Sequence, residues 1–134
     1  MKTKIVGLVF GFALGAFGIA HTQGTGPTAD VGVTRDKPAT LDLGGEIEGM
    51  TGRQLRMRKL TVEPNGAVAV HSHKDRPAVL YILEGKLTDM RVGGASKEHG
   101  PGDLVAEGND VTHWVENKGS TRLVFIVADI FKTP

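Results

Sequence analysis

The chain of 134 residues contains no cysteine, and aromatic residues make up only 5% of it. Without cysteine, neither disulfide bonds nor thiolate ligands are available, so any bound metal must be held by nitrogen and oxygen atoms. An excess of charge of one sign is also missing, because 16 basic residues stand against 15 acidic ones. This balance argues against a surface that binds nucleic acid or an anionic membrane.

Segments of helical length with apolar residues at three-to-four spacing are lacking as well. Instead, short apolar or alternating runs are separated by turns rich in Gly, Pro and Asn. The runs of strand length are 68–73, 79–84, 86–92, 103–106, 111–116 and 122–130. This pattern predicts an all-β chain of antiparallel hairpins that closes into a small barrel or jelly roll.

The segment before these runs is less regular. Between Gln54 and Val62 the apolar alternation changes phase, which predicts a bulge or a frayed strand at Lys59. The turn-forming residues 64–66 are expected to turn the chain after it. Arg56 and Arg58 are expected to wet the outer face of this strand. The alternative is that they face inward and bind a substrate carboxylate through a bidentate contact.

The first twenty residues have the features of an export signal. Lys2 and Lys4 precede the apolar stretch 5–17, and residues 18–20 offer a small-x-small cleavage site. The apolar stretch is short for a membrane span, which takes about 20 residues. We therefore expect residues 1–20 to be a cleaved signal peptide, with an uncleaved anchor as the alternative. The mature chain would be periplasmic or secreted and would not contact the membrane.

The rest of the chain divides into two parts. Residues 21–52 are expected to form a lead-in of loops and short edge strands, and residues 53–131 a single barrel domain. The segment from Arg122 to Phe131 is apolar on both faces. Such a strand lies between two layers or gives one face to a subunit contact, so a homodimer is expected.

Three of the five histidines have a spacing that suits a common site. His71 and His73 are two residues apart in a strand, so their side chains point to the same face, and His113 from a partner strand can complete the set. The sequence predicts a metal site made of these three residues, with a histidine cluster without metal as the alternative. Neutral imidazoles suit Fe, Mn, Ni, Cu or Zn. His99 is expected in a surface loop.

The residues around these histidines resemble the two motifs of the cupin superfamily. The first motif is approximated from Asn65 to Gly85, and the second from Gly102 to Asn117. In the second, Gly108 and Asp110 replace the usual Pro and Gly, but both remain turn-forming residues. The resemblance implies a small single-domain cupin with the double-stranded β-helix, or jelly-roll, fold.

One position departs from the family pattern. Ala78 stands where the family has its metal-binding Glu, so the resemblance implies three ligands and a dipositive metal with no acidic residue beside it. Such a site would favour anionic ligands and would leave coordination positions open. Asp75 is an alternative source of the missing carboxylate, although a solvated loop acid is the expected reading.

The family register also places neighbouring side chains. It puts Ala78 and Leu80 on an inward, aliphatic face, and Tyr81 and Trp114 on outer faces, where packing or a subunit contact is expected rather than a substrate role. Asn117 is expected to bind the turn that follows its strand.

Two functions stay open at this point. One is an exported, metal-dependent dioxygenase or isomerase that acts on a small organic molecule, and the other is a non-catalytic module that binds a metal or a small ligand. Neither a Ser-His-Asp arrangement nor a phosphate-binding loop is visible in the sequence. Catalytic residues therefore stay unassigned, and so does the question whether the protein is an enzyme.

Overall fold

The computed structural model describes residues 25–133, so the predicted signal peptide lies outside the described residues. These residues form strands and no helix, and none of them therefore belongs to a helix that could cross a membrane. The strands are β1 (Val31–Arg35), β2 (Ala39–Asp42), β3 (Arg53–Ser72), β4 (Ala78–Glu84), β5 (Leu87–Arg91), β6 (Ser96–His99), β7 (Leu104–Glu107), β8 (Thr112–Glu116) and β9 (Leu123–Lys132).

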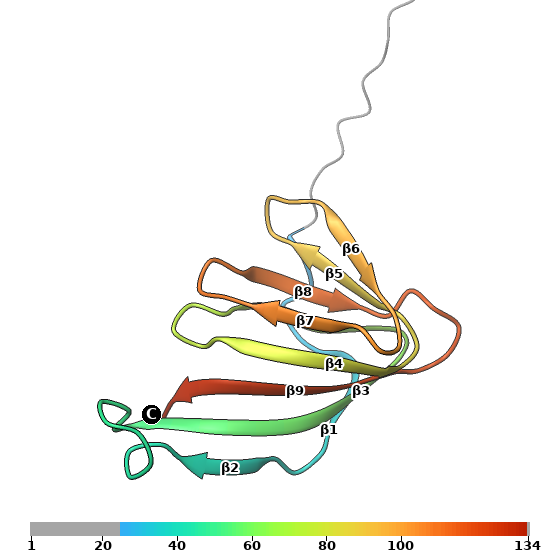
Figure 1. Cartoon of the computed structure of the whole chain (residues 1–134). Helices are drawn as coiled ribbons and strands as arrows, with labels where there is room; N and C mark the ends of the chain where they lie inside the picture. The colour runs from blue at the N-terminus through green and yellow to red at the C-terminus, as the bar shows by residue number, and fades with distance from the viewer. Residues whose placement is uncertain (1–24, 134) are drawn as a thin grey trace, which may run out of the picture.

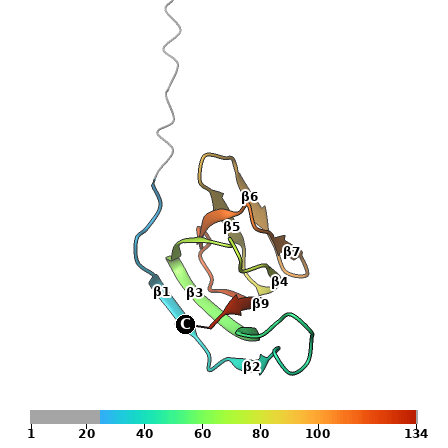
Figure 2. The ribbon, with the colours of Figure 1, turned by 90° about the vertical axis from the view of Figure 1, so that its left-hand side faces the viewer.

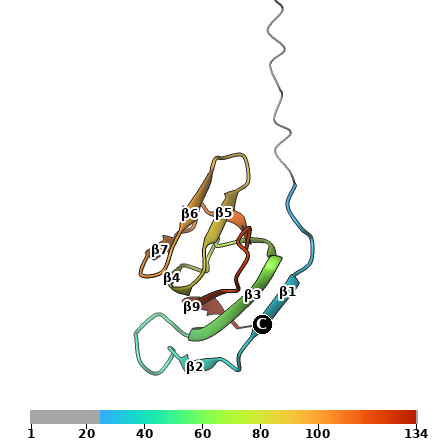
Figure 3. The ribbon, with the colours of Figure 1, turned by 90° about the vertical axis from the view of Figure 1, so that its right-hand side faces the viewer.

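All nine strands belong to one antiparallel sheet with the order β6-β5-β8-β3-β9-β4-β7, and β1 and β2 pair with β3 (Figure 1). The sheet curls, so that its end strands β6 and β7 lie near each other when the molecule is seen from either side (Figures 2 and 3). A curled sheet of this kind buries its inner face on itself. The prediction of an all-β jelly roll is confirmed.

The long strand β3 links the two halves of the curl. It pairs with β9 from Arg53 to Val62 and with β8 from Ala67 to Ser72. The predicted turn at residues 64–66 is wrong, because the chain bends there without reversing. Gly66 has no room for a side chain, since a Cβ there would lie 2.7 Å from the carbonyl oxygen of Val31 in β1. Here β3 changes partner and keeps its direction.

The first half of β3 keeps a single alternation. Its pairing with β9 runs without a register shift, so the predicted bulge at Lys59 is wrong. Leu55 and Met57 point outward and are 40% and 52% exposed, whereas Arg56 and Arg58 share the inward face of Leu60. The expectation that the arginines wet the outer face is therefore wrong. They face inward because Asp129 on β9 supplies their counter-charge.

The core lies inside the curl and is aliphatic. Its buried residues are Leu60, Val62, Val68, Ala78, Leu80, Ile82, Leu87, Val115, Leu123, Phe125 and Val127. As predicted, Ala78 and Leu80 face inward, and Tyr81 faces outward. Asn117 is buried behind the core, where its amide nitrogen donates to the carbonyl oxygens of Val62 and Thr121 at 2.9 and 2.8 Å. The predicted role of Asn117 in the turn is confirmed.

Two other side chains are less exposed than the sequence indicates. Trp114 lies on the face opposite His113, but it is only 4% exposed, because the lead-in passes over it at Gly26. His99 ends β6 and is 8% exposed, so the expected surface loop is wrong at that residue. A neighbouring segment covers Trp114, and alternation within one strand does not report such a neighbour.

Candidate metal centre

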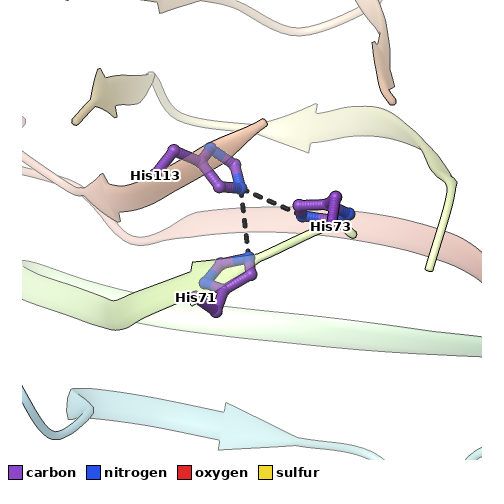
Figure 4. A group of neighbouring side chains, drawn as sticks. All are labelled: His71, His73 and His113. Atoms are coloured by element: carbon purple, nitrogen blue, oxygen red, sulfur yellow. Dashed lines mark hydrogen bonds between the residues drawn. The ribbon is translucent and has the colours of Figure 1, made fainter. Parts of the chain in front are cut away.

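The three predicted histidines meet at one end of the curl. His71 near the end of β3 is the register partner of His113 in β8, and His73 follows β3 by one residue. Nε2 of His113 lies 3.1 Å from Nε2 of His71 and 3.1 Å from Nε2 of His73 (Figure 4). The ligand atoms of all three rings lie within 4.8 Å of one another. This spacing allows one metal ion to contact all three.

The outer nitrogen of each ring has a hydrogen-bond acceptor. Nδ1 of His71 donates to the carbonyl oxygen of Ala69 at 2.8 Å, and Nδ1 of His73 donates to that of Arg76 at 3.1 Å. Because each Nδ1 must carry the proton to make these bonds, each Nε2 presents a lone pair to the centre. The backbone therefore sets the ring tautomers that metal binding requires.

Asp89 in β5 does the same for the third ring. Nδ1 of His113 donates to Oδ1 of Asp89 at 2.6 Å, and Nε of Arg91 donates to Oδ2 at 2.7 Å. Burial by itself raises the pKa of Asp89, but the contacts with His113 and Arg91 outweigh it and hold the pKa below its usual range. An ionised carboxylate behind a histidine fixes its orientation and makes it a better metal ligand.

A carboxylate that sequence reasoning missed completes the cluster. Glu107 ends β7 and is 5% exposed, and its oxygens lie 3.0 Å from Nε2 of His73 and 3.3 Å from Nε2 of His113. Its register partner on β4 is Ala78. Residues paired across an antiparallel ladder point to the same face. The carboxylate thus comes from β7, the strand that pairs with β4, whereas the resemblance to cupins places it at Ala78 on β4.

This arrangement corrects the expectation that no acidic residue lies beside the three histidines. Asp75, the alternative considered from the sequence, is an exposed loop residue whose carbonyl accepts a hydrogen bond from Arg53 at 2.6 Å, and it is not part of the cluster. Glu107 lies one residue beyond the predicted strand 103–106. The alternation of β7 is the signal that finds it, since Glu107 lies two residues after the partly buried Val105 and faces inward with it.

The electrostatics of the cluster call for a cation. Burial lowers the pKa of His71 to about 4 against the opposing effect of its hydrogen bond to Ala69, and the charges of His113, His73 and Arg76 lower it further. Nε2 of His113 then lies at hydrogen-bond distance from Nε2 of His71 and of His73, and the carboxylate of Glu107 approaches His73 and His113. A single proton can satisfy only one of these contacts, whereas a divalent ion can satisfy all of them. The nitrogen and oxygen donor set fits Fe, Mn, Ni, Cu or Zn.

A cavity of about 210 Å³ opens beside the histidines. Much of its wall is apolar, formed by Leu60, Val68, Leu80, Val115, Phe125 and Val127. The remaining wall carries charged side chains from the lead-in, from β3 and from the β3–β4 link, namely Asp30, Arg35, Arg58 and Arg76. A small molecule inside this cavity would touch both an ion at the histidines and these charges.

A second buried charge cluster lies behind that wall. Asp129 on β9 is 2% exposed and lies close to three arginines. Arg56 binds both of its oxygens, at 2.9 and 2.6 Å, while Nη2 of Arg58 lies 3.3 Å away and Nη1 of Arg76 lies 3.9 Å away. Arg56 also lies over the ring of Phe131, 4.2 Å from its centroid. Arg56 is therefore a structural residue, whereas Arg58 and Arg76 reach the cavity.

Comparison with known proteins identifies a protein family that matches this chain. The model of the Cupin_2 family, a cupin domain, matches residues 58–129, which is more than half of the chain. Both histidine segments and Glu107 fall inside the matched range. Among curated proteins, none matches this chain.

Solved structures share its fold at low sequence identity. A cupin-2 domain protein from Rhodospirillum rubrum is 22% identical with a TM-score of 0.58, and the match covers 78% of this chain and 64% of that one. A predicted oxalate decarboxylase from Thermotoga maritima is 21% identical with a TM-score of 0.51, over 71% and 92%. Oxalate oxidase in complex with the substrate analogue glycolate is 19% identical with a TM-score of 0.54, over 73% and 50%. At these identities the likeness concerns the fold alone.

Proposed function

Because this chain belongs to the Cupin_2 family, we propose that it binds one divalent transition-metal ion through His71, His73, His113 and Glu107. The observation that supports the proposal is that the three ring nitrogens lie within 4.8 Å of one another with their tautomers set from behind, and that the carboxylate of Glu107 lies 3.0 and 3.3 Å from two of them. A buried cluster of acceptors without a cation is costly, because each group loses its hydration without gaining a partner. A bound divalent ion removes that cost.

The metal-free protein tests this directly. Titration with Mn²⁺, Co²⁺, Ni²⁺ and Zn²⁺ is expected to load one ion per chain, and the Co²⁺ form is expected to show the visible spectrum of a nitrogen- and oxygen-ligated ion. Elemental analysis measures the stoichiometry. Binding well below one ion per chain for every metal would contradict the proposal.

The proposed activity is a metal-dependent reaction on a small organic molecule, of the dioxygenase or isomerase kind. When bound, the metal would act as a Lewis acid toward the substrate and toward water or dioxygen. The chain's own part is to hold the substrate in the cavity of about 210 Å³ and to exclude bulk water with its apolar wall. Oxalate oxidase and the predicted oxalate decarboxylase, which share the fold, act on or are named for a small organic acid.

A binding module is the second candidate, and one observation favours it. Among the described residues that line the cavity, the two carboxylates are both engaged: Asp30 with Arg35, and Glu107 with the histidines. No free side-chain base is then left in this wall to move a proton. Assays of the metal-loaded protein against small acids and phenols distinguish the two, since turnover of any of them excludes a purely binding role.

Export forms part of the proposal. The support is the sequence of residues 1–20, with Lys2 and Lys4 before an apolar stretch and a small-x-small site at its end. The full chain expressed in a Gram-negative host is expected to appear in the periplasm with the mass that follows cleavage after Ala20. Protein of full mass in the cytoplasm would contradict export.

A homodimer through the outer sheet face is also proposed. This face carries exposed apolar side chains on neighbouring strands, namely Leu41, Leu55, Met57, Val79, Tyr81 and Leu104. Leu41 pairs with Leu55, and Tyr81 pairs with Leu104, so the exposed groups adjoin. Monomers rarely expose contiguous patches of this kind. Light scattering is expected to give a dimer that Tyr81→Lys weakens and that Val92→Lys, at an exposed turn outside the patch, leaves intact.

A further inference from the structure

The cavity wall beside the metal centre carries surplus positive charge. Asp129 is the shared counter-ion of three arginines, and Arg56 occupies both of its oxygens at 2.9 and 2.6 Å. The contacts of Arg58 and Arg76 with the same carboxylate are longer, at 3.3 and 3.9 Å. One carboxylate balances one guanidinium, so two of these three positive charges are not balanced by it.

Arg58 also has donor capacity that the described residues do not use. Only 18% of its side chain is exposed, and its Nε is buried without a hydrogen-bond partner. Burial lowers the pKa of Arg58, and the nearby charges of Arg56, Arg76 and Arg35 lower it further against the opposing effect of Asp129. A buried guanidinium with an idle N–H is stabilised by an anion that accepts from it.

The acidic groups of the cavity do not supply that anion. Asp30 pairs with Arg35 and also accepts the backbone N–H of Ala69 at 2.9 Å. Glu107 contacts the histidines at 3.0 and 3.3 Å. Within the part of the chain that the structure describes, both cavity-lining carboxylates therefore have other partners, and Arg58 and Arg76 remain for a ligand.

The apolar part of the cavity wall indicates which kind of anion fits. Six of the lining side chains are apolar residues of the core, and a cavity of about 210 Å³ has the volume of about seven liquid water molecules. An inorganic phosphate or sulfate would leave the apolar wall without a partner. An organic acid places its carboxylate at the arginines and its carbon skeleton against that wall.

From this geometry we infer that the cavity binds a small organic carboxylate with an apolar body, whose carboxylate is held by Arg58 and Arg76. The inference deepens the proposed function and rests on it in one respect: a metal at the histidines would add positive charge to the same cavity. The arginine contacts do not need the metal, so the preference for an acid belongs to the protein itself.

Calorimetry with two matched probes tests the inference. The full chain, with Zn²⁺ and without metal, is titrated with 4-methylpentanoate and with 4-methylpentanamide, which have nearly the same shape but differ in charge. The carboxylate is expected to bind about 30-fold more tightly than the amide in both forms, from charge-assisted hydrogen bonds to the guanidinium. Inorganic phosphate is expected to bind more weakly than the carboxylate. Equal binding of acid and amide overturns the inference.

Variants assign the preference to Arg58. Arg58→Lys keeps the charge but loses the fork-shaped donor set, so the acid preference is expected to fall about 10-fold, and Arg58→Met is expected to remove it. Arg122→Gln, which removes an exposed guanidinium paired with Glu84, is the control and is expected to leave the preference unchanged. If Arg58→Met does not fold, the acid preference of the wild-type chain and of Arg58→Lys still tests the inference.

The outcomes separate this inference from the proposed function. A chain that binds Zn²⁺ but treats acid and amide alike refutes the carboxylate site and leaves the metal centre standing. A chain that binds no metal but prefers the acid refutes the metal centre and supports the arginine site. An acid preference that persists in Arg58→Met places the anion elsewhere and overturns the assignment.

Discussion

The two buried polar clusters of this protein are unbalanced in opposite directions. At the histidine cluster, three Nε2 lone pairs and the carboxylate of Glu107 converge, so acceptors are in surplus. At the arginine cluster, three guanidinium groups share the single carboxylate of Asp129, so donors are in surplus. Both clusters contribute side chains to the same cavity.

The opposite imbalance of the two clusters indicates which kind of ligand each one binds. A buried polar network that is complete in itself serves stability and specificity of folding, whereas one that lacks a partner calls for a ligand of the missing charge. The histidine cluster calls for a cation and the arginine cluster for an anion. A metal ion with a bound organic acid would supply both missing charges at once. Variants of the histidine cluster are therefore expected to lose metal affinity, whereas Asp129 variants of the arginine cluster are expected to lose stability.

The largest expected effect on stability is at Asp129. Asp129→Asn leaves the arginines without their buried counter-charge and is expected to lower the free energy of unfolding by about 3–5 kcal/mol, the usual result of breaking a buried ion pair. Urea denaturation measures it. Asp36→Asn, at an acid that is half exposed and paired with Lys59, is the control and should change stability by less than about 1 kcal/mol. A small loss at Asp129 would mean that the cluster is not structural.

At the histidine cluster the largest effect is expected on metal binding. His113→Ala removes the ring whose Nε2 lies 3.1 Å from both other histidines. Affinity for Zn²⁺ is expected to fall at least about 100-fold, because loss of a ligand costs more than the roughly 10- to 100-fold that follows loss of a group behind one. Competition with a coloured chelator measures the affinity. His99→Ala removes a buried histidine outside the cluster and should leave the affinity unchanged. Equal losses in the two variants would contradict the assignment.

A smaller loss of metal affinity is expected at Asp89, which lies behind the ring of His113. Asp89→Asn puts an amide where the carboxylate accepts from Nδ1 of His113, so the ring loses its fixed tautomer, and metal affinity is expected to fall about 10- to 100-fold. Glu98→Gln, at an exposed acid on β6, is the matched control. If Asp89→Asn lowers stability while metal affinity stays unchanged, Asp89 supports the fold and not the ligand.

The fold and the three histidines could be predicted from the sequence because both depend on local signals. Alternation and turn residues mark the strands, and a His-x-His pair in a strand must point to one face. Asn117 follows from the same kind of evidence, since its place after a strand predicts that it binds the next turn. These features need no knowledge of which strands become neighbours.

Glu107, Asp89 and the arginines could not be placed in this way. Glu107 becomes a partner of His73 only because β7 pairs with β4 opposite Ala78, and Asp89 reaches His113 only because β5 pairs with β8. Arg56 and Arg58 face inward because Asp129 lies across from Arg56 on β9. Pairings between distant segments decide these contacts, and the resemblance to cupins pointed to Ala78 and away from the neighbouring strand.

The carboxylate of the proposed metal centre lies on β7, opposite Ala78 on β4, and metal affinity in variants of these two positions tests its role. Glu107→Ala is expected to weaken Zn²⁺ binding by more than the roughly 10- to 100-fold that follows loss of a group behind a ligand. The double variant Ala78→Glu/Glu107→Ala returns a carboxylate to the same face and is expected to recover most of the affinity. Unchanged affinity in folded Glu107→Ala, or a folded double variant no better than the single one, would contradict the account.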